Sequence, residues 1–212
     1  IEAVAAKYPQ GAEKMLVKVL LNREIPEGGL PADVGLAVFN VATLAQIGDL
    51  LPQSQGLIER VVTVTGPAVS KPGNYLIPLG TPLRWVLEQA GCTDQAASII
   101  LGGPMMGPAV GSFDIPLTKG VTGVLVLPKS NAPTVFPCIH CAACVDVCPL
   151  HLDPSHLGLL ARKERYEEME EIYHLNDCFE CGCCAYTCPA HIPLVQYFRV
   201  AKQMNRERKA RA

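Results

Sequence analysis

Residues 138–149 read CIHCAACVDVCP and residues 178–189 read CFECGCCAYTCP, and these two stretches hold nine of the ten cysteines, eight of them at matching positions. Both runs have the spacing C-x2-C-x2-C-x3-C-P, and Cys178 follows Cys138 by 40 residues. Thiolates at every third residue of a tight loop can reach three corners of one metal cluster. The fourth cysteine stands apart before a proline and is placed to reach a different cluster. The two runs therefore indicate an internal repeat that binds metal through cysteine.

This spacing is that of the bacterial two-cluster ferredoxins, in which the fourth cysteine of each run ligates the cluster of the other run. It predicts two 4Fe-4S clusters with crossed ligation. The expected ligands are Cys138, Cys141, Cys144 and Cys188 for the first cluster and Cys178, Cys181, Cys184 and Cys148 for the second.

Two other uses of cysteine fit the pattern less well. Disulfide frameworks are typical of small secreted domains without a large core, whereas this chain has 212 residues, of which 49% are hydrophobic. Structural zinc takes two separated C-x2-C pairs to close one tetrahedron, which leaves the doubled run unexplained. Of the remaining thiols, we expect Cys183 to pack beside a cluster and Cys92 to be structural.

The segment between the two runs is predicted to be helical. Asp153-Pro154 offers an N-cap and a first-turn proline, and apolar positions run from Leu157 to Ile172. Its acidic residues are expected to form a solvated face, with a docking patch as the alternative. Another helix is expected after Ile192-Pro193. It ends in a basic tail that is either a solvated end or a contact for an anionic membrane surface.

Residues 58–127 have the pattern of a small mixed domain. Val61–Thr65 is β-branched throughout, which favours a strand, and the glycine-rich residues 102–107 are expected to form a tight loop. The expected elements are strands at 61–65, 75–77, 98–101 and 123–127, with a helix from 82 to 91 between the second and third strands. This order suits a β-grasp-like fold, and the proline-containing residues 128–137 are typical of a linker.

The first 57 residues hold two helical patterns, at 11–21 and 41–51. Asn40 precedes the second pattern and is predicted to be its N-cap, although the same helix start would also attract a phosphate or an electron-rich ring. The region has too few strands for a complete nucleotide-binding domain. Because the chain begins at Ile1 without a methionine, we expect it to be a fragment.

Composition excludes two function classes. The formal net charge is −2, with 18 basic and 20 acidic residues, so no global basic field points to nucleic acid. No stretch approaches the roughly 18 to 20 consecutive apolar residues of a membrane-spanning helix. The chain is expected to be soluble or peripheral to a membrane.

Several strings resemble the family formed by the C subunit of the Rnf (Rsx) electron-transport complex, across essentially the whole chain. They are KYPQG at 7–11, VVTVTGP at 61–67, GGPMMG at 102–107, both cysteine runs, and IPLVQYFR at 192–199. The resemblance implies an α+β chain with four parts. These are a helical remnant of a flavin and NADH domain at 1–57, an SLBB β-grasp domain at 58–127, a linker at 128–137 and a two-cluster ferredoxin module at 138–212.

The resemblance also implies an oxidoreductase and translocase subunit. It would pass electrons between NADH, FMN and two 4Fe-4S clusters in a membrane-associated NADH:ferredoxin oxidoreductase coupled to Na+ or H+ movement. Its partners would be the other membrane and peripheral subunits and, indirectly, ferredoxin. It would lie peripherally on the cytoplasmic side of the inner membrane. FMN and NADH would bind in the full-length protein, since this fragment lacks a complete active site.

This family is similar in turn to the flavin-bearing hydrophilic subunit of respiratory complex I. The resemblance implies flavin contacts at the positions that match its two flavin motifs, namely Tyr8, Gly11, Glu13, Asn40 and Thr43. Ala12, Phe39 and Ala42 depart from those motifs.

Two alternatives stay open. A flavin-containing cobalamin reductase has similar domains and would have a corrinoid enzyme, rather than membrane subunits, as its partner. A ferredoxin-like carrier would be non-enzymatic, with neither flavin nor NADH turnover.

Overall fold

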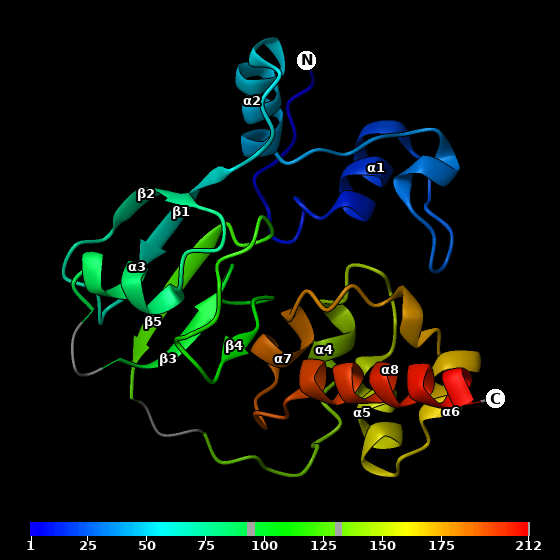
Figure 1. Cartoon of the computed structure of the whole chain (residues 1–212). Coiled ribbons are helices and arrows are strands. Elements are labelled where there is room, and N and C mark those ends of the chain that lie inside the picture. The colour runs from blue at the N-terminus through cyan, green and yellow to red at the C-terminus, as the bar shows by residue number, and fades with distance from the viewer. Residues whose placement is uncertain (93–95, 130–132, 212) are drawn as a thin grey trace. The chain divides into compact units, whose positions relative to one another are not determined.

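The computed structural model describes residues 1–92, 96–129 and 133–211. Contacts group the chain into two compact units. One unit combines Ile1–Val38 with Pro133–Ala212, and the other is Phe39–Ala132. Figure 1 shows the helices and strands of both units.

The unit Phe39–Ala132 is built on a five-stranded sheet in the order β2-β1-β5-β3-β4. Its strands are β1 (Glu59–Thr65), β2 (Gly73–Pro78), β3 (Ala96–Leu101), β4 (Ala109–Val110) and β5 (Gly123–Pro128). β1 and β5 are parallel, and the other neighbouring strands are antiparallel. The helix α3 (Leu83–Gln89) lies across the sheet (Figure 1). This arrangement confirms the predicted mixed fold; only the short strand β4 was not predicted.

The core of this unit follows from the alternation along β1. Val62 and Val64 are buried, whereas Val61, Thr63 and Thr65 are exposed, as expected for a strand with one face on the core. The buried face packs against Leu83, Val86 and Leu87 of α3. Gly66 ends the strand at φ 131°, and a Cβ there would lie 2.0 Å from the backbone oxygen of Val126. A glycine is therefore required where the predicted turn begins.

The same unit contains the helix α2 (Val41–Leu50), followed by the short 3-10 helix η2 (Leu51–Gln53). The Asn40 side chain accepts a hydrogen bond of 3.0 Å from the backbone N–H of Ala42. This bond satisfies one of the donors that a helix start leaves open. The predicted N-cap is confirmed.

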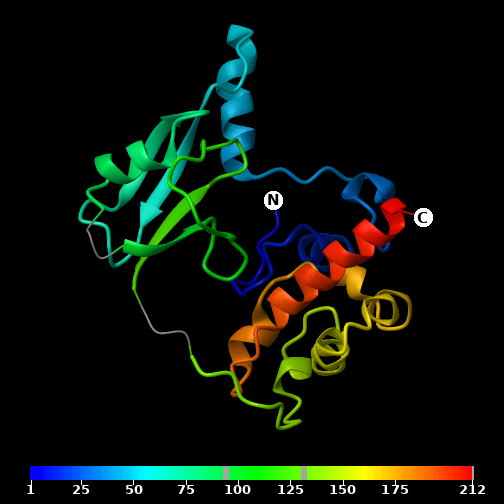
Figure 2. The same cartoon turned by 60° about the horizontal axis from the view of Figure 1, so that its bottom comes forward.

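The other unit is helical. Its elements are α1 (Glu13–Leu21), η1 (Pro31–Val34), α4 (Ala143–Asp146), α5 (Pro154–Arg162), α6 (Tyr166–Glu171), η3 (Leu175–Asp177), α7 (Cys183–Thr187) and α8 (Leu194–Arg211). The long helix α8 packs against α5 and α6 (Figure 2). Its Phe198 is buried with Leu157 of α5, Met169 of α6 and Leu175 of η3. Four elements therefore share one apolar core.

The expected helix between the cysteine runs is two helices. Asp153 caps α5 as predicted, accepting from the backbone N–H of His156 at 2.9 Å. The chain then breaks at Glu164, whose φ is 56°, and α6 begins at Tyr166. A side chain at positive φ cannot continue a right-handed helix, so the apolar positions on either side of the break belong to separate helices.

The acidic residues of α6 and the basic tail of α8 pair with one another. Lys209 lies 2.6 Å from Glu170, and Arg208 forms an ion pair with Glu167. The acidic face is therefore not only a solvated face, and part of the positive charge of the tail is paired within the unit. No helix in the described ranges has the length and apolar character to cross a membrane.

The compact units divide the chain at other places than the predicted domains do. Residues 39–57 group with the sheet, and residues 1–38 group with the cysteine-rich helices. Grouping by contacts does not test domain boundaries that are inferred from sequence. The boundaries at 57, 127 and 137 therefore stay predictions.

Candidate metal centres

The first candidate site is an apolar pocket beside α4. Cys138, Cys141 and Cys144 of the first run line it, and Cys188 of the second run joins them. Ile139, Ile192 and Leu194 are among the other lining residues. Four thiols from both runs therefore converge on one pocket.

The second candidate site is a pocket beside α7. Cys178, Cys181 and Cys184 line it together with Cys148, the last cysteine of the first run. Leu157, Val195 and Phe198 of the helical core are also part of its lining. The exchange of the fourth cysteine is therefore reciprocal between the two pockets.

The loops that carry the thiols repeat in backbone as well as in sequence. The backbone φ is positive at His140 (57°) and Ala142 (60°) and, 40 positions later, at Glu180 (61°) and Gly182 (86°). The N–H of His140 donates to the Sγ of Cys138 at 3.4 Å, and the N–H of Glu180 donates to the Sγ of Cys178 at the same distance. Such hydrogen bonds to sulfur are one of the factors that set the potential of an iron–sulfur cluster.

Burial and the crowding of thiols oppose ionisation of cysteines at both pockets. Burial raises the pKa of Cys184 to about 12, and the neighbouring Cys178 and Cys181 add to the rise. Burial also raises the pKa of Cys144, with a contribution from Cys188. Without a cation these thiols resist ionisation, whereas a bound metal deprotonates its thiol ligands outright. In the part of the chain that the structure describes, none of these thiols is held in a disulfide.

Cys183 is a fifth thiol at the second pocket. Burial raises its pKa to about 11, and a hydrogen bond with Cys181 contributes to the rise. The structure thus places it beside the predicted ligands. In the first run Ala143 stands at the matching position.

Three of the predicted flavin-contact positions lie in the helical unit. The Tyr8 hydroxyl donates to the backbone oxygen of Cys181 at 2.5 Å, and Glu13 begins α1 two residues after Gly11. In addition, Lys14 of α1 lies 3.7 Å from Asp177, just before the second run. The N-terminal segment therefore contacts the chain around the second cysteine loop.

The other two predicted positions, Asn40 and Thr43, lie in the sheet unit. Asn40 acts as the N-cap of α2, and Thr43 lines a shallow apolar hollow with Gln46 and Leu50. The five predicted positions are therefore divided between the two units. Their role as flavin contacts stays a prediction.

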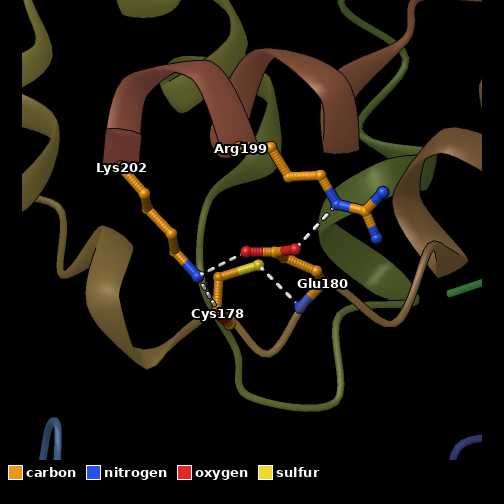
Figure 3. Close-up of polar contacts among 4 residues, drawn as sticks. All are labelled: Cys178, Glu180, Arg199 and Lys202. Atoms are coloured by element: carbon orange, nitrogen blue, oxygen red, sulfur yellow. Dashed lines mark hydrogen bonds and ion pairs between the residues drawn. The ribbon is translucent and has the colours of Figure 1, made fainter. Parts of the chain in front are cut away.

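A charged cluster at the second loop was not singled out from the sequence. Glu180, between two of the cysteines, binds Arg199 and Lys202 of α8 (Figure 3). The sequence contains only a weak indication of this cluster. Arg199 and Lys202 are three residues apart and therefore lie on one face of a helix. Their partner, however, lies about twenty residues away in the sequence.

Each of the two pockets in the helical unit brings together three cysteines of one run and the fourth cysteine of the other, as in the class of two-cluster iron–sulfur proteins. Comparison with known families agrees with this class. Residues 137–192 match a 4Fe-4S dicluster domain, residues 61–109 match the SLBB domain, and residues 1–49 match the Nuo51 FMN-binding domain.

Over most of its length the chain is similar to C subunits of ion-translocating ferredoxin:NAD+ oxidoreductase complexes. It is 47% identical over 209 residues to the C subunit of the proton-translocating ferredoxin:NAD+ oxidoreductase complex of Clostridium ljungdahlii, covering 97% of this chain and 46% of that protein. It is 41% identical over 173 residues to the C subunit of the Na+-translocating complex of Acetobacterium woodii, covering 80% of this chain and 39% of that protein. The C subunit of the ion-translocating oxidoreductase complex of Pasteurella multocida is 44% identical over 207 residues, which cover 95% of this chain and 25% of the relative. The chain thus spans less than half the length of these relatives.

Proposed function

We propose that this chain holds two 4Fe-4S clusters and relays electrons within an ion-translocating ferredoxin:NAD+ oxidoreductase. The observation that carries the proposal is the exchange of the fourth cysteine. Cys188 lies with the thiols of the first run and Cys148 with those of the second. This is the ligand pattern of two-cluster ferredoxins. The proposed ligands are therefore the eight cysteines predicted from the spacing.

When bound, such clusters take up and release one electron at a time. The residues of this chain supply the surroundings of the two pockets. The apolar core around Leu157 and Phe198 excludes water from the second pocket. The backbone N–H groups of His140 and Glu180 point at ligand sulfurs. Because both pockets open on one helical unit, electron exchange between them requires no movement of a separate domain.

The match of residues 1–49 to an FMN-binding domain supports a flavin in the full-length protein. There, FMN would take electrons from NADH, with Tyr8, Gly11, Glu13, Asn40 and Thr43 as the proposed flavin contacts. The bond between Tyr8 and Cys181 supports a short distance from this segment to the second cluster. The proposed domains are the flavin remnant at 1–57, the SLBB domain at 58–127, the linker at 128–137 and the cluster module at 138–212.

The relatives' names support partners in a membrane complex. We place the protein peripherally on the cytoplasmic side of the inner membrane. Its proposed partners are the other membrane and peripheral subunits of the complex and, through them, ferredoxin. Its electron relay would be coupled in the whole complex to the movement of Na+ or H+.

Anaerobic mixing of the purified full-length protein with NADH tests this proposal. The relay predicts that NADH bleaches the visible absorption of the clusters, and that removing the flavin abolishes the bleaching. Dithionite reduction of the same sample is the control, because it reduces clusters without flavin. Clusters that are reduced by dithionite but not by NADH would contradict the relay and favour the non-enzymatic carrier. Co-purification with a corrinoid enzyme rather than membrane subunits would favour the cobalamin reductase.

A further inference from the structure

The second pocket has a largely buried positive charge at its rim. Lys202 of α8 has a side chain that is only 12% exposed. Its ammonium group donates to the backbone oxygen of Cys178 at 2.5 Å and to the carboxylate of Glu180 at 3.0 Å. Figure 3 shows this group reaching from α8 to the loop that carries the ligand thiol.

Glu180 is shared between two cations. Its other carboxylate oxygen accepts from Nε of Arg199 at 2.8 Å, and its side chain is 25% exposed. One negative charge therefore faces two positive charges, which leaves the group with a net charge of +1. The shared carboxylate holds both cations in place beside Cys178 (Figure 3).

The first pocket has different surroundings. The residue 40 positions before Glu180 is His140, which is exposed. Arg162 lines this pocket, but its side chain is also exposed. Water and salt screen exposed charges far more than they screen buried ones. The charge of Lys202 therefore acts on the second pocket more strongly than that of Arg162 acts on the first.

We propose that Lys202 raises the reduction potential of the cluster in the second pocket. Reduction adds one negative charge to a cluster, and a nearby buried cation favours the form with more negative charge. Net charge around a cluster is one of the factors that set its potential. This inference rests on the proposed function, because it requires a cluster bound by Cys148, Cys178, Cys181 and Cys184.

Redox titration of the full-length protein, followed by EPR spectroscopy, tests the inference with two variants of opposite sign. In Lys202→Met, one of the two cluster reduction steps should move to lower potential. At a fixed poise, the reduced-to-oxidised ratio of that cluster should fall about tenfold, equivalent to about 59 mV for a one-electron couple. In Glu180→Gln, the same step should move to higher potential, since a negative charge is removed. The other step should stay in place in both variants.

Two matched controls separate charge from structure. Lys202→Arg keeps the cation and should leave both steps near their wild-type positions. Lys209→Met removes another cation of α8, one bound to Glu170 rather than to the cysteine loop, and should move neither step. The step that moves is assigned to the second pocket if Cys148→Ser also perturbs it.

Iron and sulfide counts on every sample distinguish the two proposals. A wild-type protein without clusters would overturn the proposed function and this inference together. Intact clusters with no shift in either variant, or with shifts of the same sign in both, would overturn this inference alone. If Lys202→Met fails to fold, the upward shift in Glu180→Gln, or its absence, decides the matter.

Discussion

The loops at 138–144 and 178–184 share one backbone conformation, yet their thiols differ in solvent exposure. Cys141 is exposed, whereas the matching Cys181 has only 8% of its surface accessible. Part of the cover over the second loop comes from distant segments, since Tyr8 binds the backbone of Cys181 and Lys202 binds that of Cys178. Local spacing thus repeats the ligand geometry, while tertiary contacts make the two sites chemically different.

The difference bears on electron transfer because solvent exposure and nearby charge both tune cluster potentials. Two clusters with identical ligand spacing and identical surroundings would have equal reduction potentials, so neither would be favoured as the site of an added electron. Here one site is covered and lies beside a buried cation, and the other is more open.

The largest effect is expected from the exchanged cysteines. Serine in place of either fourth cysteine should impair one cluster. Double variants then reveal which cysteines serve the same cluster. Cys138→Ser with Cys188→Ser should lose about as much iron as the more damaging single change, because both residues serve the same cluster. Cys178→Ser with Cys188→Ser should lose roughly the sum of the two, because these residues serve different clusters. Iron analysis after anaerobic purification provides the measurement, and the reverse pattern would refute crossed ligation.

A smaller effect is expected at the matched residues Ala142 and Gly182. Both have positive φ, at 60° and 86°, where a Cβ costs about 1–2 kcal/mol. Gly182→Ala should therefore lower the free energy of unfolding by about that amount. Ala142→Gly should leave the free energy of unfolding unchanged or raise it slightly, because the relief of strain, about 1–2 kcal/mol, is at least as large as the penalty of roughly 0.4–1 kcal/mol from the greater chain entropy of glycine in the unfolded state. Denaturant titration under anaerobic conditions measures both, and equal losses would show that the two loops do not share this conformation in solution.

The smallest effect is expected from Cys183→Ala, which gives the second run the residue that the first run has at Ala143. Because a free cysteine next to a cluster packs as a small apolar side chain, the change should alter the free energy of unfolding by less than about 1 kcal/mol. Iron content and EPR spectra should stay the same. A lost or altered cluster would show instead that Cys183 is a ligand.

The grouping of the thiols into two pockets could be predicted because the cysteine spacing constrains it. The cysteine repeat, the cap at Asp153 and the β-branched run at 61–65 are local patterns, and the structure contains each of the features that they predict. The break at Glu164 depends on one residue at positive φ, which helical periodicity does not reveal. Lys202 and Tyr8 bind the cysteine loop across 24 and 173 residues of sequence. Contacts at such separations arise from packing, so no short pattern predicts them.

The most direct test of the account is the iron and acid-labile sulfide content of the anaerobically purified protein, with EPR spectra taken after dithionite reduction. Two clusters of four irons predict about eight irons and eight sulfides per chain, together with the spectrum of reduced 4Fe-4S centres. One or two zinc ions per chain, without sulfide and without an EPR signal, would contradict it.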